Sequence, residues 1–391
     1  MRSMADYLRI FQGVDWDFED YSSRNFKLDI NNMHWYVAAF VPQIPDILIQ
    51  ALSNKGDLIL DPFAGSGVTL VEAAKLGRKF IGVDINPLAV EISKAKFQAI
   101  VHATPDWKDD LENEVLDSNI KESVDNYCER HGINPEVFKW FEKRTLAELI
   151  SIHNIILANH RNQFLLEKVL FSCILKRSCS QRRHYTYITD GCYPEKFKYK
   201  AARKFFLEQA ELMSRASEIF QEQYRQRYSK DYRYNGEIKL GDARNLEGVD
   251  EASVSLVVTS PPYLGTHDYV KSTRLTNLFF PESGFGEFKK NEIGARYKRG
   301  RKTAYEEYIN DMKKAFEECH RILIPKGFFG LTLGKGGGRV VKSNVVRQLI
   351  DFLIFNLNFK LIYKNTRRIT NRRIRFPSVL REHVIVLQKT K

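Results

Sequence analysis

The chain has 391 residues and a hydrophobic fraction of 43%, so it can bury a large core and divide into two or three domains. Its 61 lysines and arginines outnumber 48 acidic residues, and the charge of +13 favours a polyanionic partner, nucleic acid before membrane, over a merely solvated basic surface. Five cysteines without CxxC spacing, and the lack of any apolar run near the roughly 18 to 20 residues of a membrane span, exclude a disulfide framework and a membrane protein. With no apolar signal segment at the start either, we expect a cytoplasmic protein.

The first part of the chain leads into a sheet. Residues 1–30 lack clear periodicity and are predicted to be irregular. An aromatic loop over 34–45 then leads into a helix that begins near Ile47 and ends near Gly56.

A strand over 58–60 is followed by a glycine-rich turn and a helix over 69–77. In the turn, Gly65 and Gly67 allow a tight bend and close approach of the backbone to a ligand. A structural turn without a ligand explains most such patterns when they stand alone. No lysine follows the glycines, which argues against a phosphate-binding loop, and Leu70 stands where a dinucleotide-binding motif has its third glycine.

The next strand, over 79–83, ends in Asp84, about twenty residues beyond the glycines. From this position a carboxylate can accept hydrogen bonds from both hydroxyls of a ribose, and a simple turn cap is the alternative. The glycine turn and the acid together predict a nucleoside cofactor.

Residues from 95 to 234 contain long helical segments and no convincing strand, and they are predicted to form an inserted helical domain. Within it, the stretch over 176–187 alternates cations, hydroxyls and aromatic rings. Its Arg182 and Arg183 are candidates for phosphate contacts, although a solvated basic helix end explains the same pattern.

The sheet resumes over 237–240, and Asp242 after this strand could accept a hydrogen bond from an adenine amino group or cap the turn. A buried strand over 254–259 then stops at the tetrapeptide 260–263, because its two prolines can neither extend a ladder nor lie inside a helix. Ligands bind at the carboxyl ends of strands in an open α/β sheet. The hydroxyl, rigid carbonyls and aromatic ring of this tetrapeptide could therefore clamp a flat heterocycle that carries an amino group.

Two basic segments follow the tetrapeptide. The first, over 289–302, contains glycines and suits contact with a phosphate backbone beside the ligand edge, and the second, over 364–375, carries six cations and no acid. The candidate phosphate contacts in them are Lys298, Arg299, Arg301, Arg368 and Arg372. The other predicted elements are helices over 136–156, 165–175, 199–228, 305–322 and 341–355, strands over 328–333, 359–363 and 383–387, and a turn at 325–327.

Strands that alternate with helices predict an α/β protein with a doubly wound sheet. The motifs in it resemble those of the amino-methyltransferases of DNA, which use S-adenosylmethionine to methylate the exocyclic N4 of cytosine or N6 of adenine. Residues 61–67 match the cofactor loop of that family, and Ser260-Pro261-Pro262-Tyr263 matches its (Asp/Asn/Ser)-Pro-Pro-(Tyr/Phe) tetrapeptide. Residues 34–45 resemble its flanking cofactor-binding segment. The resemblance covers residues 30–100 and 236–391.

The resemblance implies a Rossmann-like methyltransferase sheet with a cofactor-binding half over 1–95 and a catalytic half over 236–391. The helical insertion over 96–235 would be the target-recognition domain, S-adenosylmethionine the cofactor, double-stranded DNA the substrate and a cognate restriction endonuclease a potential partner. The implied catalytic residues are Ser260, Pro261, Pro262 and Tyr263. The implied cofactor contacts are His34, Tyr36, Phe40, Pro42, Asp61, Phe63, Ala64, Gly65, Gly67, Thr69, Asp84, Ile85, Asp242 and Ala243.

Serine in the first position of the tetrapeptide is more usual for the N4-cytosine enzymes, so the resemblance favours cytosine and leaves adenine open. Methylation at C5 of cytosine requires a cysteine nucleophile after a proline, and none of the five cysteines follows a proline. An RNA guanine-N2 methyltransferase and a non-catalytic nucleic-acid-binding protein remain alternatives. His267 and Asp268 could form an acid–base pair, although amino methylation does not require one. No cluster has zinc-ligand spacing, so we predict no metal.

Overall fold

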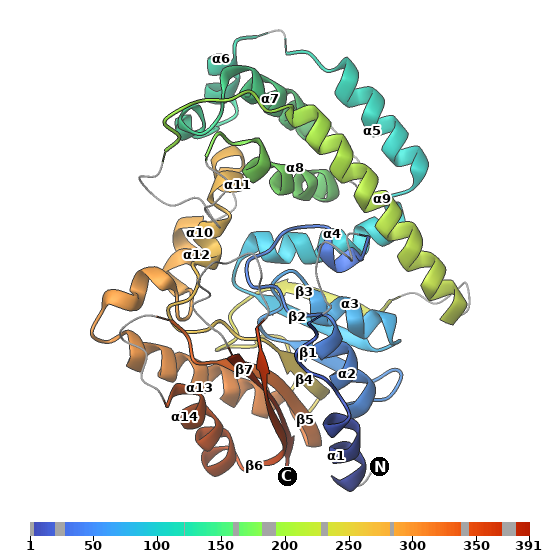
Figure 1. Ribbon diagram of the computed structural model, residues 1–391, viewed down its shortest axis with the longest axis vertical. Coiled ribbons are helices and arrows are strands. Elements are labelled where there is room, and N and C mark those ends of the chain that lie inside the picture. The colour runs from blue at the N-terminus through green and yellow to red at the C-terminus, as the bar shows by residue number, and fades with distance from the viewer. Residues whose placement is uncertain are drawn as a thin grey trace.

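The computed structural model describes residues 4–19, 28–120, 122–158, 164–181, 193–227, 234–281, 285–337, 344–369 and 381–391. Its centre is a seven-stranded sheet in the order β3-β2-β1-β4-β5-β7-β6 (Figure 1). The strands are β1 (Leu58–Asp61), β2 (Lys79–Asp84), β3 (Gly236–Leu240), β4 (Val254–Thr259), β5 (Leu323–Gly334), β6 (Phe359–Arg368) and β7 (Arg381–Lys389).

Strands β1 to β5 are parallel, and β7 lies antiparallel between β5 and β6. The chain winds outward from β1 through β2 to β3 on one side, and from β4 to β5 on the other, so the winding reverses between β1 and β4. Ligands of open α/β sheets bind at such a switch point, beyond the carboxyl ends of the strands. The predicted doubly wound α/β sheet is thus confirmed, and its ligand edge lies where β1 ends at Asp61 and where β4 ends directly before Ser260.

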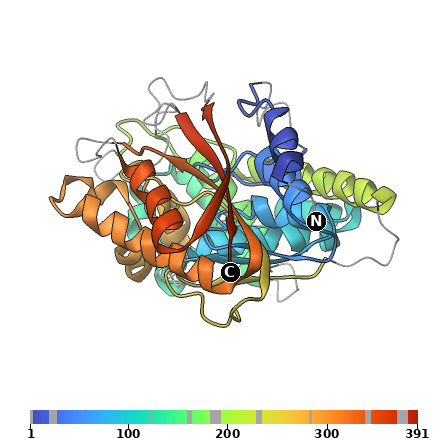
Figure 2. The same cartoon turned by 90° about the horizontal axis from the view of Figure 1, so that it is seen from below.

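Both faces of the sheet are covered by helices, as Figure 2 shows from below. Alternate strand residues supply the two cores: Ile59 and Leu256 belong to one hydrophobic cluster, and their neighbours Leu60 and Val257 belong to the other. The helices on the first face are α1 (Met4–Gln12), α2 (Gln43–Leu52), α3 (Val68–Lys75) and α4 (Pro87–His102). The second face carries α13 (Ala304–Ile322), α14 (Val345–Asp351) and the π-helical turn η5 (Phe352–Asn356).

A helical insertion lies between β2 and β3 in the chain and above the sheet in Figure 1. It packs on α4 through α8 (Phe164–Ser178) and α9 (Ala202–Arg227), and its Phe171 belongs to the same hydrophobic cluster as Ile92 of α4. Because α4 runs to His102, the division predicted at residue 95 falls inside a helix. The insertion consists of α5 (Pro105–Asp117), α6 (Val124–Arg130), η2 (Pro135–Lys139), α7 (Lys143–Ala158), α8 (Phe164–Ser178) and α9 (Ala202–Arg227). Within the described ranges no helix has both the length and the apolar character needed to cross a membrane.

Short helical elements lie between the longer helices and strands along the chain. Helix α11 (Arg274–Phe279) reaches the insertion, where the amide of Asn134 donates to the carbonyl of Leu278 at 2.8 Å. The segment after the tetrapeptide therefore joins the sheet to the insertion. The short elements are η1 (Ile30–Asn32), α10 (Tyr269–Ser272), α11 (Arg274–Phe279), α12 (Phe285–Asn291) and η4 (Arg296–Gly300).

Local structure departs from the sequence-based prediction at several places, and one of them is β6, which is longer than the strand predicted over 359–363. The expectation that residues 1–30 are irregular was wrong, because α1 packs Tyr7 against Phe328 with ring centroids 5.2 Å apart. The turn predicted at 325–327 is a bulge within β5, since Val254 pairs with Leu323 and the next paired residue, Leu256, faces Phe328. The helix predicted over 136–156 is divided into η2 and α7.

Candidate active site

The glycine-rich turn after β1 is shaped by two residues in left-handed conformations, Gly65 with φ +51° and Gly67 with φ +77°. A side chain at Gly67 would also lack room, because its Cβ would lie 2.7 Å from Oγ of Ser93 in α4. The hydroxyl of Ser93 donates to the carbonyl of Gly65 at 2.9 Å. Helix α4 thus holds the turn from one side, and Gly65 lines a cleft on the other.

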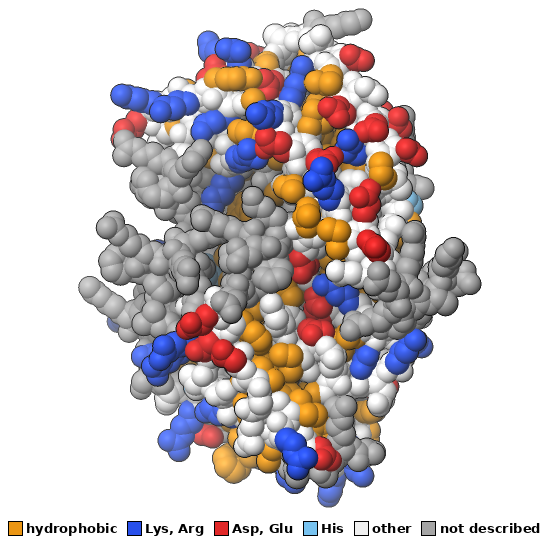
Figure 3. Space-filling view, turned by 45° about the vertical axis from the view of Figure 1, so that its right-hand side comes forward, with side chains coloured by type: hydrophobic (Ala, Val, Ile, Leu, Met, Phe, Trp, Pro, Cys, Tyr) orange, Lys and Arg blue, Asp and Glu red, His pale blue; other side chains and the backbone are white. Residues whose placement is uncertain are grey.

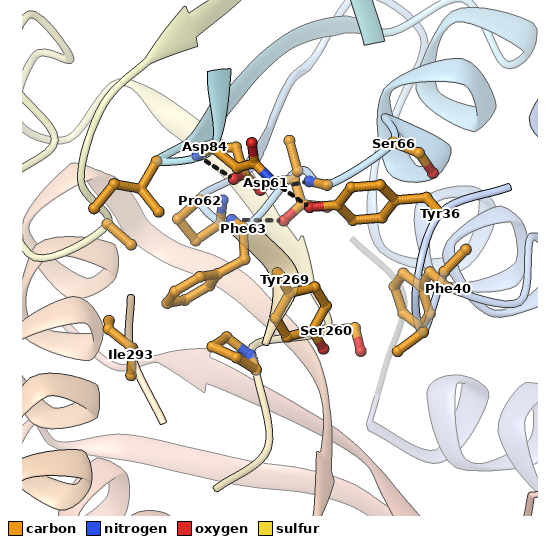
Figure 4. Close-up of a pocket in the computed structure, with 18 of the residues that line it drawn as sticks. Tyr36, Phe40, Asp61, Pro62, Phe63, Ser66, Asp84, Ser260, Tyr269 and Ile293 are labelled. Carbon is orange, nitrogen blue, oxygen red and sulfur yellow. Dashed lines mark hydrogen bonds between the residues drawn. The ribbon is translucent and has the colours of Figure 1, made fainter. Parts of the chain in front are cut away.

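Asp84 ends β2 and is tied to this turn (Figure 4). Its Oδ2 accepts from the amide of Gly65 at 2.8 Å, and its Oδ1 accepts from the amide of Asn86 at 2.9 Å. Burial raises the pKa of Asp84 to about 6, although these backbone donors oppose the shift. A carboxylate is therefore fixed at the wall of the cleft with lone pairs left for a ligand.

Asp61 supplies a second carboxylate at the end of the neighbouring strand β1. It is buried, accepts a hydrogen bond from the amide of Phe63 at 3.0 Å and lines the same cleft. Burial also raises the pKa of Asp61 to about 6. Two acceptors thus lie side by side at the switch point, where amino or hydroxyl groups of a bound molecule can donate to them.

An aromatic wall completes this part of the cleft. Tyr36 and Phe40 come from the loop before α2, and the ring of Tyr269 stands 6.2 Å from that of Tyr36 at an angle of 30°. The side-chain amide of Asn86 donates to the hydroxyl of Tyr36 at 3.4 Å. Ala38 in this loop has φ +52°, a strained conformation for a residue with a Cβ. Flat rings next to two carboxylates suit a nucleoside.

Most of the predicted cofactor contacts line this cleft together. They are Tyr36, Phe40, Asp61, Phe63, Ala64, Gly65, Thr69, Asp84, Ile85, Asp242 and Ala243. Three others do not line it. His34 is buried with its Nε2 2.8 Å from the hydroxyl of Ser172 in the insertion, Pro42 precedes α2, and Gly67 packs on α4.

The sequence-based prediction missed part of the cleft wall, which comes from the segment after the tetrapeptide. Tyr269, Asn291, Glu292 and Ile293 line the cleft, and Glu292 is buried and accepts a hydrogen bond from the amide of Tyr269. No sequence signal marks them, because they approach the cleft only through the tertiary fold. Asn86 was detectable, since an Asn before a Pro is a helix-start pattern directly after the strand that ends in Asp84.

The tetrapeptide follows β4, and its members face different surroundings. Ser260 and Pro262 line the cleft, and the carbonyl of Pro262 accepts from the hydroxyl of Tyr308 at 3.0 Å. Pro261 is buried. Tyr263 lies against β5 and β7, where its hydroxyl donates to Oε2 of Glu382 at 2.6 Å. Ser260 is thus the member with a side-chain hydroxyl in the same cleft as Asp61 and Asp84.

The basic segment over 289–302 is attached to the chain directly after the tetrapeptide. The amide of Arg296 donates to the carbonyl of His267 at 3.0 Å, and the amide of Tyr297 donates to Oδ1 of Asp268 at 2.8 Å. Burial lowers the pKa of His267 to about 4, so its imidazole is neutral near pH 7. His267 and Asp268 therefore anchor the basic segment beside the cleft.

The residues predicted to contact phosphates differ in their exposure and in their hydrogen bonds within the chain. Arg299 and Arg301 are exposed, whereas the ammonium of Lys298 donates to the carbonyls of Lys290 at 3.0 Å and Glu292 at 2.7 Å. Arg368 is exposed near the end of β6, and Arg182, Arg183 and Arg372 lie outside the described residues. On the face in Figure 3, Lys and Arg side chains of the helical part are interspersed with Asp and Glu.

Comparison with known proteins identifies the family. Residues 7–95 and 254–391, more than half of the chain, match the family model N6_N4_Mtase, described as DNA methylase. The chain is 23% identical over 401 residues to the type II methyltransferase M.MjaII of Methanocaldococcus jannaschii, a match covering 79% of this chain and 73% of that protein. The chain is also 44% identical over 55 residues to the DNA adenine methyltransferase YhdJ of Escherichia coli. This shorter match covers 14% of this chain and 19% of that protein.

Among solved structures, the rRNA methyltransferase aviRa from Streptomyces viridochromogenes has a TM-score of 0.37 and 12% identity, with 94% of this chain and 93% of that chain covered. Nothing about function follows from this likeness. The family match rests instead on two stretches that contain the glycine turn, the tetrapeptide and every strand of the described sheet except β3. The chain belongs to the DNA amino-methyltransferases of the N4/N6 family, which take their methyl group from S-adenosylmethionine.

Proposed function

We propose that this chain is a type II DNA methyltransferase that methylates the exocyclic N4 of cytosine at specific sites, in a base turned out of the duplex. The observation that supports this most is the shared cleft: Ser260 of the tetrapeptide lines it together with Asp61 and Asp84. A base whose amino nitrogen is held by Ser260 would therefore lie next to a nucleoside cofactor held by Asp61 and Asp84.

We assign the cofactor to the part of the cleft between the aromatic wall and the two carboxylates. When bound there, S-adenosylmethionine supplies an electrophilic methyl group. The carboxylate of Asp84 would accept hydrogen bonds from its ribose hydroxyls, and Asp242 would accept one from its adenine amino group. The rings of Tyr36 and Phe40 would cover its flat surfaces. The fit rests on an acid fixed by the turn and on aromatic rings beside it.

The exocyclic amino nitrogen is a poor nucleophile because its lone pair is delocalised into the ring of the base. If the hydroxyl of Ser260 and the carbonyl of Pro261 accept its two hydrogen bonds, the nitrogen moves toward tetrahedral geometry and its lone pair becomes available. The carbonyl of Pro262 already accepts from Tyr308 and is not needed for this role. Positioning would supply most of the rate, without a covalent nucleophile. Tyr263 would stack on the target base, which must leave the duplex to be reached.

Serine in the first position favours cytosine through the resemblance to the N4-cytosine enzymes. Adenine is the second candidate, because the local match to YhdJ is a match to a DNA adenine methyltransferase. A restriction endonuclease that cuts the same site would be the partner of a type II enzyme.

We assign double-stranded DNA to the ligand edge, where its phosphates would meet the basic segment. Arg299 and Arg301 are exposed on a segment that hydrogen-bonds to His267 and Asp268, so they stand close to the chain that follows the tetrapeptide. Lys298 would act indirectly, since its ammonium holds the carbonyls of the segment. The helical insertion over 96–235 would recognise the target sequence, and Arg182, Arg183, Arg368 and Arg372 remain candidates for further phosphate contacts.

The proposal can be tested by incubating unmethylated DNA with S-adenosylmethionine labelled in its methyl group. We expect label in the DNA, and Ser260→Ala should lower turnover on the order of 10²-fold, because the amino group loses one of its two acceptors. Ser253→Ala is the matched control, since Ser253 directly precedes the start of the same strand, at the end opposite Ser260, and its hydroxyl donates to the carbonyl of Asp250. Equal turnover in the two variants would remove Ser260 from the proposed site.

A further inference from the structure

We propose that Glu382 of β7 and Arg367 of β6 are positioning residues for Tyr263, and that they set the orientation in which its ring meets the target base. This inference deepens the proposed function and rests on it. The tetrapeptide of the family accepts Tyr or Phe in its fourth position. Because the hydroxyl of Tyr263 hydrogen-bonds to the charged Glu382, we expect this chain to require Tyr rather than Phe at this position.

The first observation is the hydrogen bonding of the Tyr263 hydroxyl. It donates its one proton to Oε2 of Glu382 at 2.6 Å, and its oxygen lies 3.3 Å from the hydroxyl of Thr332. The first bond has the length of a strong bond to a carboxylate, whereas the second is long. Burial and the negative charge of Glu382 raise the pKa of Tyr263 well above its ordinary value, so the hydroxyl keeps its proton and stays a donor.

The second observation is that Glu382 is itself fixed. It stands directly opposite Arg367 in the register of β6 and β7, and Nη1 of Arg367 donates to its Oε1 at 2.5 Å. Both side chains are buried, with 8% and 4% of Glu382 and Arg367 exposed. A buried ion pair adds little stability once its desolvation is counted, so its effect here is better sought in geometry.

The third observation joins the pair to the amino-terminal segment. Nε of Arg367 donates to the carbonyl of Trp16 at 2.7 Å, and Nη2 donates to the carbonyl of Asp17 at 3.3 Å. Its guanidinium also lies 5.8 Å from the ring centroid of Phe18. The network thus runs from the segment after α1, through Arg367 and Glu382, to the tetrapeptide.

The fourth observation concerns the ring of Tyr263. A Cβ added at Gly334, at the end of β5, would lie 2.6 Å from Cε2 of this ring. The ring is therefore packed on bare backbone while its hydroxyl is held by Glu382. With contacts at both places, the ring has a defined orientation before any base arrives, and such preorganisation raises turnover without adding affinity.

The test begins with Tyr263→Phe, which keeps the ring and leaves the Glu382–Arg367 pair intact. We expect kcat for methyl transfer to unmethylated DNA to fall about 10-fold, the effect of removing one hydrogen bond to a charged group. The Kd for S-adenosylmethionine should stay unchanged, because Tyr263 does not line the cofactor cleft. If the ring of residue 263 acts only by stacking on the base, Tyr263→Phe would have the kcat of the wild type. That result would overturn the proposal.

A double-mutant cycle then asks whether Glu382 acts through Tyr263. Glu382→Gln should lower kcat in the wild-type background and have no further effect in the Tyr263→Phe background. Additive effects in the double variant would overturn the proposal. Thr366→Val is the matched control, because Thr366 and His383 form the neighbouring register pair with an exposed contact, and neighbouring residues of a strand point to opposite faces of the sheet. Its kcat should equal that of the wild type.

Glu382→Gln leaves the charge of Arg367 buried without its partner and could prevent folding. In that case the paired replacement Glu382→Leu with Arg367→Met takes its place in the cycle, with the same expected outcome. Methyl transfer by the wild type distinguishes a failure of the proposed function from a failure of the role assigned to Glu382 and Arg367. A wild type that transfers no methyl group would overturn the proposed function and this inference together, whereas an active wild type with an unaffected Tyr263→Phe variant would overturn the inference alone.

Discussion

The carboxylate of Asp84 and the backbone amide of Gly65 are joined by a 2.8 Å hydrogen bond across nineteen residues of sequence. The glycine turn after β1 and the acid at the end of β2 are therefore one rigid unit. If this unit holds the ribose of the cofactor, the acid contributes in two ways, since it fixes the turn and accepts from the ligand.

Asp84→Asn should weaken binding of S-adenosylmethionine about 10-fold or more, because the amide offers one acceptor oxygen where the carboxylate offers two. Calorimetric titration with the cofactor measures this change. Asp46→Asn on α2 is the control, since the carboxylate of Asp46 accepts from Gln50 and Asp46 does not line the cleft. Unchanged affinity in Asp84→Asn would show that the ribose lies elsewhere.

Gly67→Ala should destabilise the fold and weaken cofactor binding, because it adds a steric conflict to backbone strain. Gly56→Ala separates the two causes: Gly56 has φ +87° but its Cβ would meet nothing within 4 Å, whereas at Gly67 the Cβ would lie 2.7 Å from Ser93 Oγ. We expect about 1 kcal/mol of destabilisation for Gly56→Ala and more for Gly67→Ala in denaturant unfolding. Only Gly67→Ala should change the cofactor Kd, and equal effects at both positions would argue against a built turn.

Replacing Arg299, Arg301 and Lys302 by Gln should lower affinity for DNA of any sequence, because these exposed cations would meet phosphates. The slope of log K against log salt should become shallower by about 0.9 for each phosphate that the variant no longer neutralises. The control replaces three exposed lysines at the opposite edge of the sheet, where strands β2, β5 and β6 begin, namely Lys79, Lys326 and Lys360. A salt slope that changes equally in both triple variants would reflect net charge alone.

Stability should depend on pH through the two buried carboxylates of the cleft. The pKa values of Asp61 and Asp84 are raised from 3.8 to about 6, so the folded chain binds these protons more tightly than the unfolded chain. Their contribution to the free energy of unfolding is therefore lost as pH rises from 3.8 to about 6. Asp61→Asn and Asp84→Asn should each flatten this decline in denaturant unfolding measured across that range. Asp250→Asn, at an exposed carboxylate, should follow the wild type.

The sequence was sufficient to predict the sheet and most of the cleft because the relevant signals are local. Gly65 and Gly67 mark a turn whose left-handed backbone favours glycine, and Asp84 follows at a fixed offset because it ends the next parallel strand. The tetrapeptide is marked by prolines that end β4. In each case a short run of residues determines both the backbone and the chemistry.

Other parts of the site depend on tertiary contacts that no local pattern reveals. Glu292 reaches the cleft from a basic segment whose composition suggested only phosphate binding, and Tyr269 reaches it from the chain between the tetrapeptide and that segment. Arg367 looked like one cation in a basic run, yet β6 continues through it and turns its side chain inward while Arg368 points to solvent. Adjacent residues of a strand face opposite sides of the sheet. A correct prediction of the length of β6 would therefore have indicated that one of these two arginines is buried and the other exposed.

The nucleosides of the product DNA provide the most direct test of the central claim. Unmethylated DNA is incubated with the protein and with S-adenosylmethionine carrying an isotope-labelled methyl group, digested to nucleosides and analysed by mass spectrometry. The account predicts label in N4-methylcytosine, and Ser260→Ala should reduce it strongly. Label in N6-methyladenine would contradict the choice of base, and label only in 5-methylcytosine, or none in the DNA, would contradict the proposed chemistry of the cleft.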